Sequence, residues 1–270
     1  MNSVPNLPIT KISGKYARTN WPAASVVHEI FVIGKFGTEF IALLALSIQY
    51  CCLCQKAALL CMVKDDLNEK QRDELAELMK NLPEWKQKLG GKSLPIEKFV
   101  IQKAERFLKQ GNFLVLPALE LIYLWNGFRI LGQSHAMIEP VYQLVEKAET
   151  DARKEKNDRM FFLEDICLIT LLKGMCFKFM NLPKQAEECF EFVIDQEGQL
   201  ITDTYLVLYA QFELALKMKS DGQLSGSLDL LEKIQKDKGH HHHILQLDLR
   251  IHTMQSEILA KINSDKKHTL

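Results

Sequence analysis

Glycine and proline are scarce in this chain, and neither sign of charge is in excess. The 270 residues include 13 glycines and 8 prolines, below the average shares of roughly 7% and 5%. So few turn residues favour long helices over a many-turned β fold. Lys and Arg together number 34, as do Asp and Glu. Because balanced charge does not provide the basic surface of a nucleic-acid-binding domain, we expect no nucleic-acid partner.

The longest apolar run is short for a membrane-spanning helix. It covers the fifteen residues 40–54, FIALLALSIQYCCLC, and is followed by Gln55 and Lys56, whereas a span needs about 20 apolar residues. We expect a buried helix here, with membrane insertion or peripheral attachment as the alternative. The first 25 residues show no signal-peptide pattern. The expected location is therefore cytoplasmic or, in the alternative, the cytosolic face of a membrane.

The cysteines do not form a disulfide or metal-ligand pattern. Their number is odd, and most lie within apolar helical runs, so we expect reduced thiols in a cytosolic-type compartment. Cys51–Cys54 contains a C-x-x-C pair, but a zinc site would need a second pair or a histidine at ligand spacing. Core packing is expected for this pair, with lipid attachment or redox sensitivity as alternatives. The seven cysteines are residues 51, 52, 54, 61, 167, 176 and 189.

Two further motifs resemble ligand sites but lack the required context. Gly90–Ser93 ends like a phosphate-binding loop, yet position 86 is Lys instead of Gly and no strand is predicted before it. We expect an interhelical turn there. His240–His243 are adjacent in sequence, and since metal ligands must converge from fixed directions, we expect a solvated linker. No catalytic residue, cofactor or metal site is predicted.

Helical segments separated by Gly, Pro or Asn dominate the sequence from residue 38 onward. Apolar residues recur at i, i+3, i+4 and i+7; along residues 206–217 this pattern places Glu213 and Lys217 on a charged face. The sequence predicts an irregular segment 1–37, an all-α repeat domain 38–262 and a flexible tail 263–270. The expected helices cover residues 38–63, 67–81, 94–110, 113–131, 136–155, 160–180, 184–196, 203–219, 224–236 and 244–262.

A repeat with an interval of 41 residues occupies the C-terminal half. Small residues align with small ones, and large apolar residues align with large apolar ones. In each copy the small residues lie twelve apart, Gly174 with Ala186 and Ala215 with Ser227. Small side chains where two antiparallel helices cross let the backbones approach closely. The pattern therefore predicts an α-solenoid of stacked helical hairpins. The aligned pairs are Gly174 and Ala215, Phe177 and Met218, Ala186 and Ser227, Phe190 and Leu231, and Val193 and Ile234.

This spacing resembles the tetratricopeptide repeat (TPR), which has small residues at repeat positions 8 and 20 and large ones at 11 and 24. Residues 163–197 match at all four positions. The match departs at position 7, where Lys173 replaces Leu, and at position 32, where Gly198 replaces Pro. Because the interval exceeds the usual 34 residues, we expect a long loop around 197–203.

Five sequence segments resemble the C-terminal portion of the tetratricopeptide repeat protein 39 family. Members of that family are related to a fungal mitochondrial outer-membrane and inclusion-body-clearance protein. The resemblance covers residues 50–262, is strongest from residue 94, and does not extend to the atypical start at 1–40. It implies an α-helical repeat scaffold without enzymatic activity or cofactor. The segments are IEKFVIQKAERF (96–107), LPALELIYLWNGF (116–128), LLKGMCFKFM (171–180), YAQFELAL (209–216) and LRIH (249–252).

The TPR register implies that the first helix of each hairpin lines an inner groove. This groove would be apolar at its centre with a lysine from each repeat at one rim, unlike the Lys/Asn-lined clamp of chaperone-tail-binding TPR proteins. We expect a protein–protein interaction scaffold or adaptor that binds an amphipathic helix or an extended peptide with acidic flanks. The expected groove residues are Leu171, Met175, Lys178, Tyr209, Phe212, Leu216 and Lys219.

Three alternatives stay open at the level of the sequence. In the first, another part of the same fold covers the groove, and its residues are core. In the second, the chain is a membrane-associated adaptor, mitochondrial outer-membrane-like, anchored through the helix 38–63. In the third, it is an enzyme whose residues converge from several hairpins. The helix 38–63 is apolar nearly all round, so we expect residues 1–36 to cover it, or oligomers or membrane contacts to form through it.

Overall fold

The structure is a computed structural model that describes residues 54, 56–62, 67–84, 88–89, 92–93, 95–154, 160–237 and 245–268. Two compact units divide the chain between Ala148 and Glu149, a boundary that falls inside the predicted 38–262 repeat domain. The predictions for residues 1–37, most of 38–63, Cys51–Leu53 and His240–His243 lie outside the described residues. No helix in the part of the chain described combines the length and the apolar character needed to cross a membrane.

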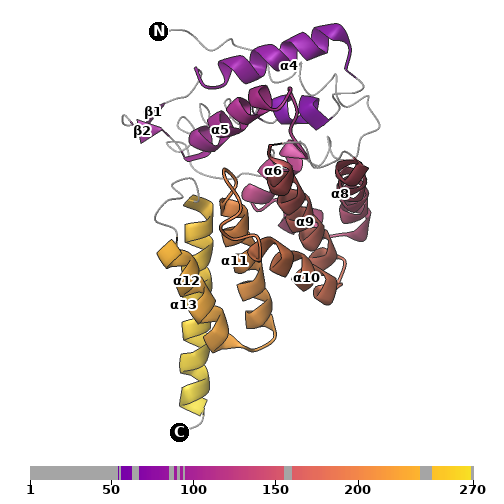
Figure 1. The fold of residues 1–270 in the computed structure, drawn as a ribbon. Coiled ribbons are helices and arrows are strands. Elements are labelled where there is room, and N and C mark those ends of the chain that lie inside the picture. The colour runs from indigo at the N-terminus through magenta and orange to yellow at the C-terminus, as the bar shows by residue number, and fades with distance from the viewer. Residues whose placement is uncertain are drawn as a thin grey trace. The chain divides into compact units, whose positions relative to one another are not determined.

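The first unit is built from short helices. Residues 56–62 are helical and bury Ala57, Leu60 and Cys61. A capping box formed by Asn68 and Gln71 starts the helix that follows, because the two side chains bind backbone N–H groups that lack helical partners. The helices that follow are α4 (Glu69–Asn81), α5 (Pro95–Lys109), α6 (Pro117–Leu124), α7 (Phe128–Leu131) and α8 (His135–Lys154); Figure 1 labels all of them except α7. Helix α8 reaches past the unit boundary.

Two details of this unit differ from the sequence prediction. The predicted helix 113–131 is interrupted between α6 and α7, because Asn126 adopts a left-handed conformation with φ 59° and Gly127 N–H donates back to the Ile122 carbonyl, an arrangement that ends a helix. The second difference is a short β-hairpin. The sequence predicted no strand before Gly90, and this prediction was wrong, because Lys88–Leu89 (β1) pairs antiparallel with Lys92–Ser93 (β2).

The second unit consists of two helical hairpins and a final helix. The first hairpin is α9 (Phe162–Phe179) with α10 (Pro183–Ile194), and the second is α11 (Tyr205–Ser220) with α12 (Leu224–Asp237). In Figure 1 the last helix, α13 (Leu245–His268), lies beside α12. The prediction of an all-α, TPR-like solenoid of stacked hairpins is confirmed. Because α13 is helical to His268, the boundary predicted at residue 262 was too early.

A buried carboxylate fixes the long loop between the two hairpins. The Glu164 side chain accepts hydrogen bonds from the backbone N–H groups of Ile201, at 3.0 Å, and Thr202, at 3.3 Å. Glu164 stands in the first turn of α9 and is buried. These bonds satisfy backbone donors that the extra loop residues would otherwise leave without a partner. The loop is therefore tied to the start of the first hairpin.

The small residues of the repeat lie where the helices of each hairpin cross. A Cβ atom added at Gly174 would lie 2.7 Å from the Phe190 ring and 2.9 Å from the Cys189 Cβ. In the second hairpin, the Ser227 hydroxyl donates to the Ala215 carbonyl at 2.8 Å, and both residues are buried. These contacts confirm the close approach of the helices that the spacing predicted.

Replacing Gly174 by Ala is expected to destabilise the protein by about 1–3 kcal/mol, because the added methyl group overlaps a ring and the first side-chain atom of the facing helix. The matched control is Gly226→Ala in α12, where the added Cβ would meet only the terminal methyl of Met218. That flexible end can move, and Ala favours helix over Gly by about 1 kcal/mol. Urea denaturation of both variants measures the difference. Equal stability of the two variants would contradict a tight crossing at Gly174.

Candidate functional site

Most of the predicted groove residues lie in the interior. Leu171 and Met175 of α9 and Tyr209 and Phe212 of α11 are buried. The guanidinium of Arg250, from α13, lies 4.5 Å from the centre of the Phe212 ring. At this position, therefore, a later helix of the same unit covers the first helix of a hairpin. The burial agrees with the alternative in which these four residues are core.

The three remaining groove residues, Lys178, Leu216 and Lys219, are partly exposed. Lys178 Nζ lies 2.6 Å from a carboxylate oxygen of Glu213, and Lys219 forms an ion pair with Glu257 of α13. The sequence predicted both lysines as cations available to an acidic partner segment. In the structure each lysine already has an acidic partner within the unit, Glu213 of α11 for Lys178 and Glu257 of α13 for Lys219. The contact with an acidic partner segment stays a prediction.

Glu213 is the centre of a charged cluster that joins three helices. Its side chain has no exposed surface, and it accepts hydrogen bonds from Lys178 of α9 at 2.6 Å and from Arg250 of α13 at 3.0 Å. The sequence pattern placed Glu213 on the charged face of its helix, and the structure shows that this residue is buried. A buried carboxylate stays ionised only if cations and hydrogen-bond donors take the place of the water molecules that it has lost. The shared position between two cations meets that requirement.

The environment of Glu213 favours its ionised form. Burial acts to raise the pKa of this carboxyl, but the charges of Lys178 and Arg250 and their hydrogen bonds outweigh burial and hold the pKa below its ordinary value. Burial also raises the pKa of the neighbouring Tyr209 hydroxyl, an effect that the Arg250 charge opposes. Both groups therefore keep a fixed protonation state near neutral pH, the behaviour of a structural cluster.

Acid is expected to weaken the second unit through Glu213. Because the folded pKa is lower than the ordinary value of 4.5, its contribution to stability is present above that value and is lost as pH falls through the folded pKa. Thermal unfolding between about pH 7 and pH 3 measures this loss. Since other carboxyls titrate in the same window, Glu213→Gln serves as the control. The Tm of the wild type should fall more steeply in acid than that of the variant, and parallel curves would contradict the assignment.

Burial favours the protonated form of two cysteines of the second unit. Burial raises the pKa of the Cys167 thiol to about 12 and that of Cys189 to about 11. Both remain protonated near neutral pH, and a protonated thiol is a poor nucleophile. Within the described ranges, no group of three or more His, Cys, Asp or Glu side chains is placed to hold a metal ion.

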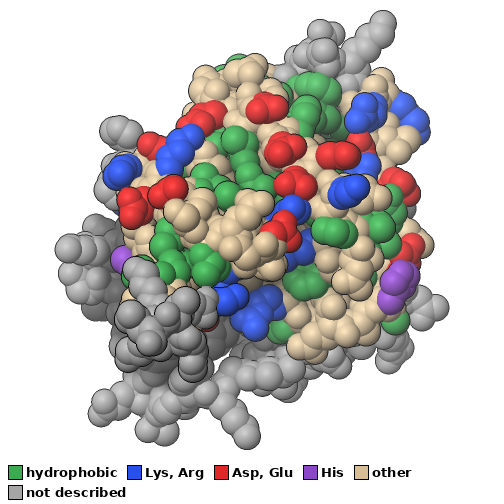
Figure 2. All heavy atoms as spheres, turned by 90° about the horizontal axis from the view of Figure 1, so that it is seen from below, with side chains coloured by type: hydrophobic (Ala, Val, Ile, Leu, Met, Phe, Trp, Pro, Cys, Tyr) green, Lys and Arg blue, Asp and Glu red, His purple; other side chains and the backbone are tan. Residues whose placement is uncertain are grey.

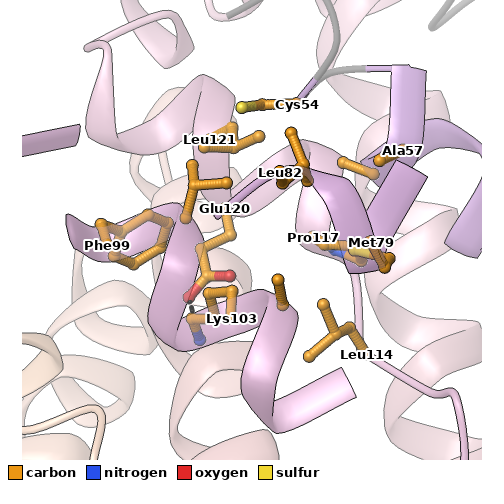
Figure 3. Close-up of a pocket in the computed structure, with 13 residues that line it drawn as sticks. Cys54, Ala57, Met79, Leu82, Phe99, Lys103, Leu114, Pro117, Glu120 and Leu121 are labelled. Carbon is orange, nitrogen blue, oxygen red and sulfur yellow. Dashed lines mark ion pairs between the residues drawn. The ribbon is translucent and has the colours of Figure 1, made fainter. Parts of the chain in front are cut away.

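A small cavity in the first unit contains a buried ion pair (Figure 3). Lys103 of α5 and Glu120 of α6 are both buried, and their charged atoms lie 2.7 Å apart. The other walls are mainly apolar, and the cavity measures about 30 Å³. This volume holds about one water molecule, so we assign the pair a structural role. The apolar wall includes Cys54, Met79, Phe99, Leu114 and Leu121.

The charged residues buried in both units were missed by the sequence analysis. Glu120 interrupts the apolar run LPALELIYL, and Glu213 interrupts YAQFELAL. A single acidic residue within an apolar helical run is the signal that could have identified them, because a charged side chain is buried only where it is paired with a residue of opposite charge. The partners, Lys103 and Arg250, lie on other helices and could not be found by local pattern.

Surface charge on the face shown in Figure 2 is mixed. Among the coloured, described residues, acidic and basic side chains alternate there, with apolar side chains between them. In the second unit, ion pairs join Lys217 to Glu187 and Lys233 to Glu197. Mixed charge of this kind suits many partner surfaces and gives no strong preference for a single sign.

Comparison with known proteins identifies the region of the chain that is shared with others. Residues 50–180 match the family model described as Iml2/Tetratricopeptide repeat protein 39. The chain is 34% identical over 153 residues to Tetratricopeptide repeat protein ttc-39B of Caenorhabditis elegans, an alignment that covers 57% of this chain and 25% of the relative. The chain thus spans about a quarter of the length of that curated relative. No solved structure matches the chain.

Proposed function

We propose that this chain is a non-enzymatic scaffold or adaptor that binds other proteins through its TPR-like hairpins, because residues 50–180 match the family model described as Iml2/Tetratricopeptide repeat protein 39. The stacked hairpins, with their close crossing at Gly174, are the observation that carries the proposal. Such arrays present side chains of successive helices on one continuous surface, which suits the recognition of an extended peptide or a helix.

The partner would contact the part of the predicted groove that is still accessible. Leu216 is partly exposed, and Lys178 and Lys219 keep part of their side chains in contact with solvent. Leu216 would supply an apolar contact to the partner. Lys178 and Lys219, which now pair with Glu213 and Glu257, would supply polar contacts by binding acidic groups of the partner. The four buried groove residues support this surface from below and do not contact the partner.

Affinity capture with the full chain as bait, followed by quantitative mass spectrometry, tests the proposal. Leu216→Glu places a charge at the proposed contact, whereas Phe192→Glu places the same charge on α10, where Phe192 is 40% exposed. A protein retained by the wild type and the control should be reduced about tenfold or more with Leu216→Glu. Circular dichroism confirms that both variants are folded.

Two outcomes would contradict the proposal in different ways. If both variants retain the same proteins in the same amounts as the wild type, the contact does not run through Leu216. If the wild type retains nothing above an unrelated bait, the scaffold function itself fails.

A further inference from the structure

The two lysines at equivalent repeat positions are held by carboxylates in different surroundings. Lys178 pairs with Glu213, whose side chain has no exposed surface and is also bound by Arg250. Lys219 pairs with Glu257 of α13, whose side chain is 57% exposed. A buried carboxylate that loses a cation stays uncompensated, whereas an exposed one regains water. The Lys219 pair can therefore open at low cost, whereas Lys178 must keep Glu213 while it contacts a partner.

Glu257 has a second cation within reach on its own helix. Lys261 follows four residues later on α13 and is exposed, and a glutamate pairs with a lysine at i+4 because both lie on one face of the helix. If the Glu257 carboxylate leaves Lys219, it can therefore pair with Lys261. An ion pair between α11 and α13 is then exchanged for one within α13.

The Lys219 pair lies where the apolar row of the groove ends. Met175, Leu216 and Glu257 follow one another at intervals of 41 residues, so the row that is apolar in α9 and α11 continues in α13 as a carboxylate. Leu216 also precedes Lys219 by three residues, the spacing of neighbours on one face of a helix. A partner side chain that contacts Leu216 would therefore lie about one helical turn from the Lys219–Glu257 pair.

We propose that Glu257 is an internal competitor for the groove, and that an acidic side chain of a partner segment displaces it from Lys219. This inference rests on the proposed scaffold function and specifies the partner. The partner is a peptide or helix in which an acidic residue lies close to the apolar residue that contacts Leu216. The ion pair with Glu257 keeps Lys219 from binding weakly matched segments.

Charge beside Leu216 agrees with an acidic occupant. The two ion-paired groups next to it, together with the neighbouring Lys261, contain four cations and two carboxylates. This excess of positive charge complements a segment that brings carboxylates of its own. The cations are Lys178, Lys219, Arg250 and Lys261, and the carboxylates are Glu213 and Glu257.

Selection from a random peptide library displayed on phage, with the immobilised full chain as bait, tests the chemistry of the occupant. In the retained peptides, Asp or Glu should be enriched within about four positions of Leu, Ile or Phe. Selection on Lys219→Gln should lose the enrichment of acidic residues and keep that of apolar ones. A peptide retained by the wild type is then labelled with fluorescein, and its affinity is measured by fluorescence anisotropy.

Removing the competitor should tighten the binding of this peptide. Glu257→Gln is expected to raise the affinity by about two- to fivefold, the range that an exposed ion pair supplies, and Lys219→Gln should lower it by a similar factor. The matched control is Glu232→Gln in α12, which removes the same charge from an exposed glutamate that also pairs with a lysine, Lys236. This control should bind the peptide as the wild type does.

A double-mutant cycle tests the exchange from Lys219 to Lys261. Lys261→Gln removes the second partner of Glu257 and should lower the affinity by about twofold in the wild type. The same substitution should have no effect in a chain that already carries Glu257→Gln. An equal loss in both backgrounds would contradict the exchange, because Lys261 would then act on the peptide directly.

The outcomes separate this inference from the proposed function. Retained peptides without enrichment of acidic residues would overturn the inference and leave the scaffold function standing. The same conclusion would follow if Glu257→Gln bound the peptide no more tightly than the wild type, or if Glu232→Gln raised the affinity equally. A wild type that retains no peptide above an unrelated bait would count against the scaffold function itself, and the inference would fail with it.

Discussion

Replacing Glu213 by Gln is expected to lower the free energy of unfolding by about 3 kcal/mol. The substitution removes the charge that Lys178 and Arg250 share, while all three side chains keep their size and place. Removing one partner of a buried ion pair costs about 3–5 kcal/mol, because the remaining charge is left without compensation. The lower end applies here because both cations keep some contact with water. Urea denaturation at neutral pH measures the change.

Glu257→Gln is the matched control for this prediction. Glu257 forms an ion pair with Lys219 between the same two helices, α11 and α13, but the Glu257 side chain is largely exposed. Exposed ion pairs contribute about 0–1 kcal/mol, so the control should differ little from the wild type. Equal losses of unfolding free energy in the two variants would contradict the prediction, because they would show that burial does not increase the contribution of the Glu213 cluster to stability.

Replacing Phe212 by Ala is expected to destabilise the protein by about 3–5 kcal/mol. Phe212 is 2% exposed, and Arg250 covers its ring. The substitution removes the ring and leaves a cavity that the surrounding helices can fill only in part. Thermal and urea denaturation measure the loss.

Phe192→Ala in α10 gives the reference for an exposed phenylalanine, with an expected change within about 1 kcal/mol. The result for Phe212 also separates the two interpretations of the groove. A Tm equal to that of the wild type, combined with weaker capture of a partner, would mean that Phe212 lines an open groove after all.

The hairpin fold could be predicted because its determinants are local. Helical periodicity and Gly, Pro or Asn at the breaks define most helices of the second unit, and the interval from Gly174 to Ala215 identifies the crossings. The break at Asn126 was missed, because apolar periodicity continues through the turn and only the left-handed backbone of this residue ends the helix. Backbone conformation at single residues is weakly encoded in apolar spacing.

The accessibility of the groove could not be predicted because it depends on helices distant in sequence. The register identified Tyr209 and Phe212 as residues on one side of α11, but Arg250 of α13 decides that Phe212 is covered. Glu213 shows the same limit: the sequence pattern identifies the charged face on which it lies, but its partners Lys178 and Arg250, on other helices, make it an interior residue. Local pattern defines a helix face, and tertiary packing decides what that face meets.

The carboxylate that Lys178 and Arg250 share has a consequence for how the second unit comes apart. In a linear array each repeat contacts only its neighbours, so the terminal element can fray while the remainder stays folded. Here, detachment of the last helix would remove Arg250, one of the two cations that neutralise Glu213. It would thereby also weaken the ion pair that Glu213 forms with Lys178 of the first hairpin. End-fraying is thereby penalised, and the two hairpins and the last helix should melt together as a single cooperative block.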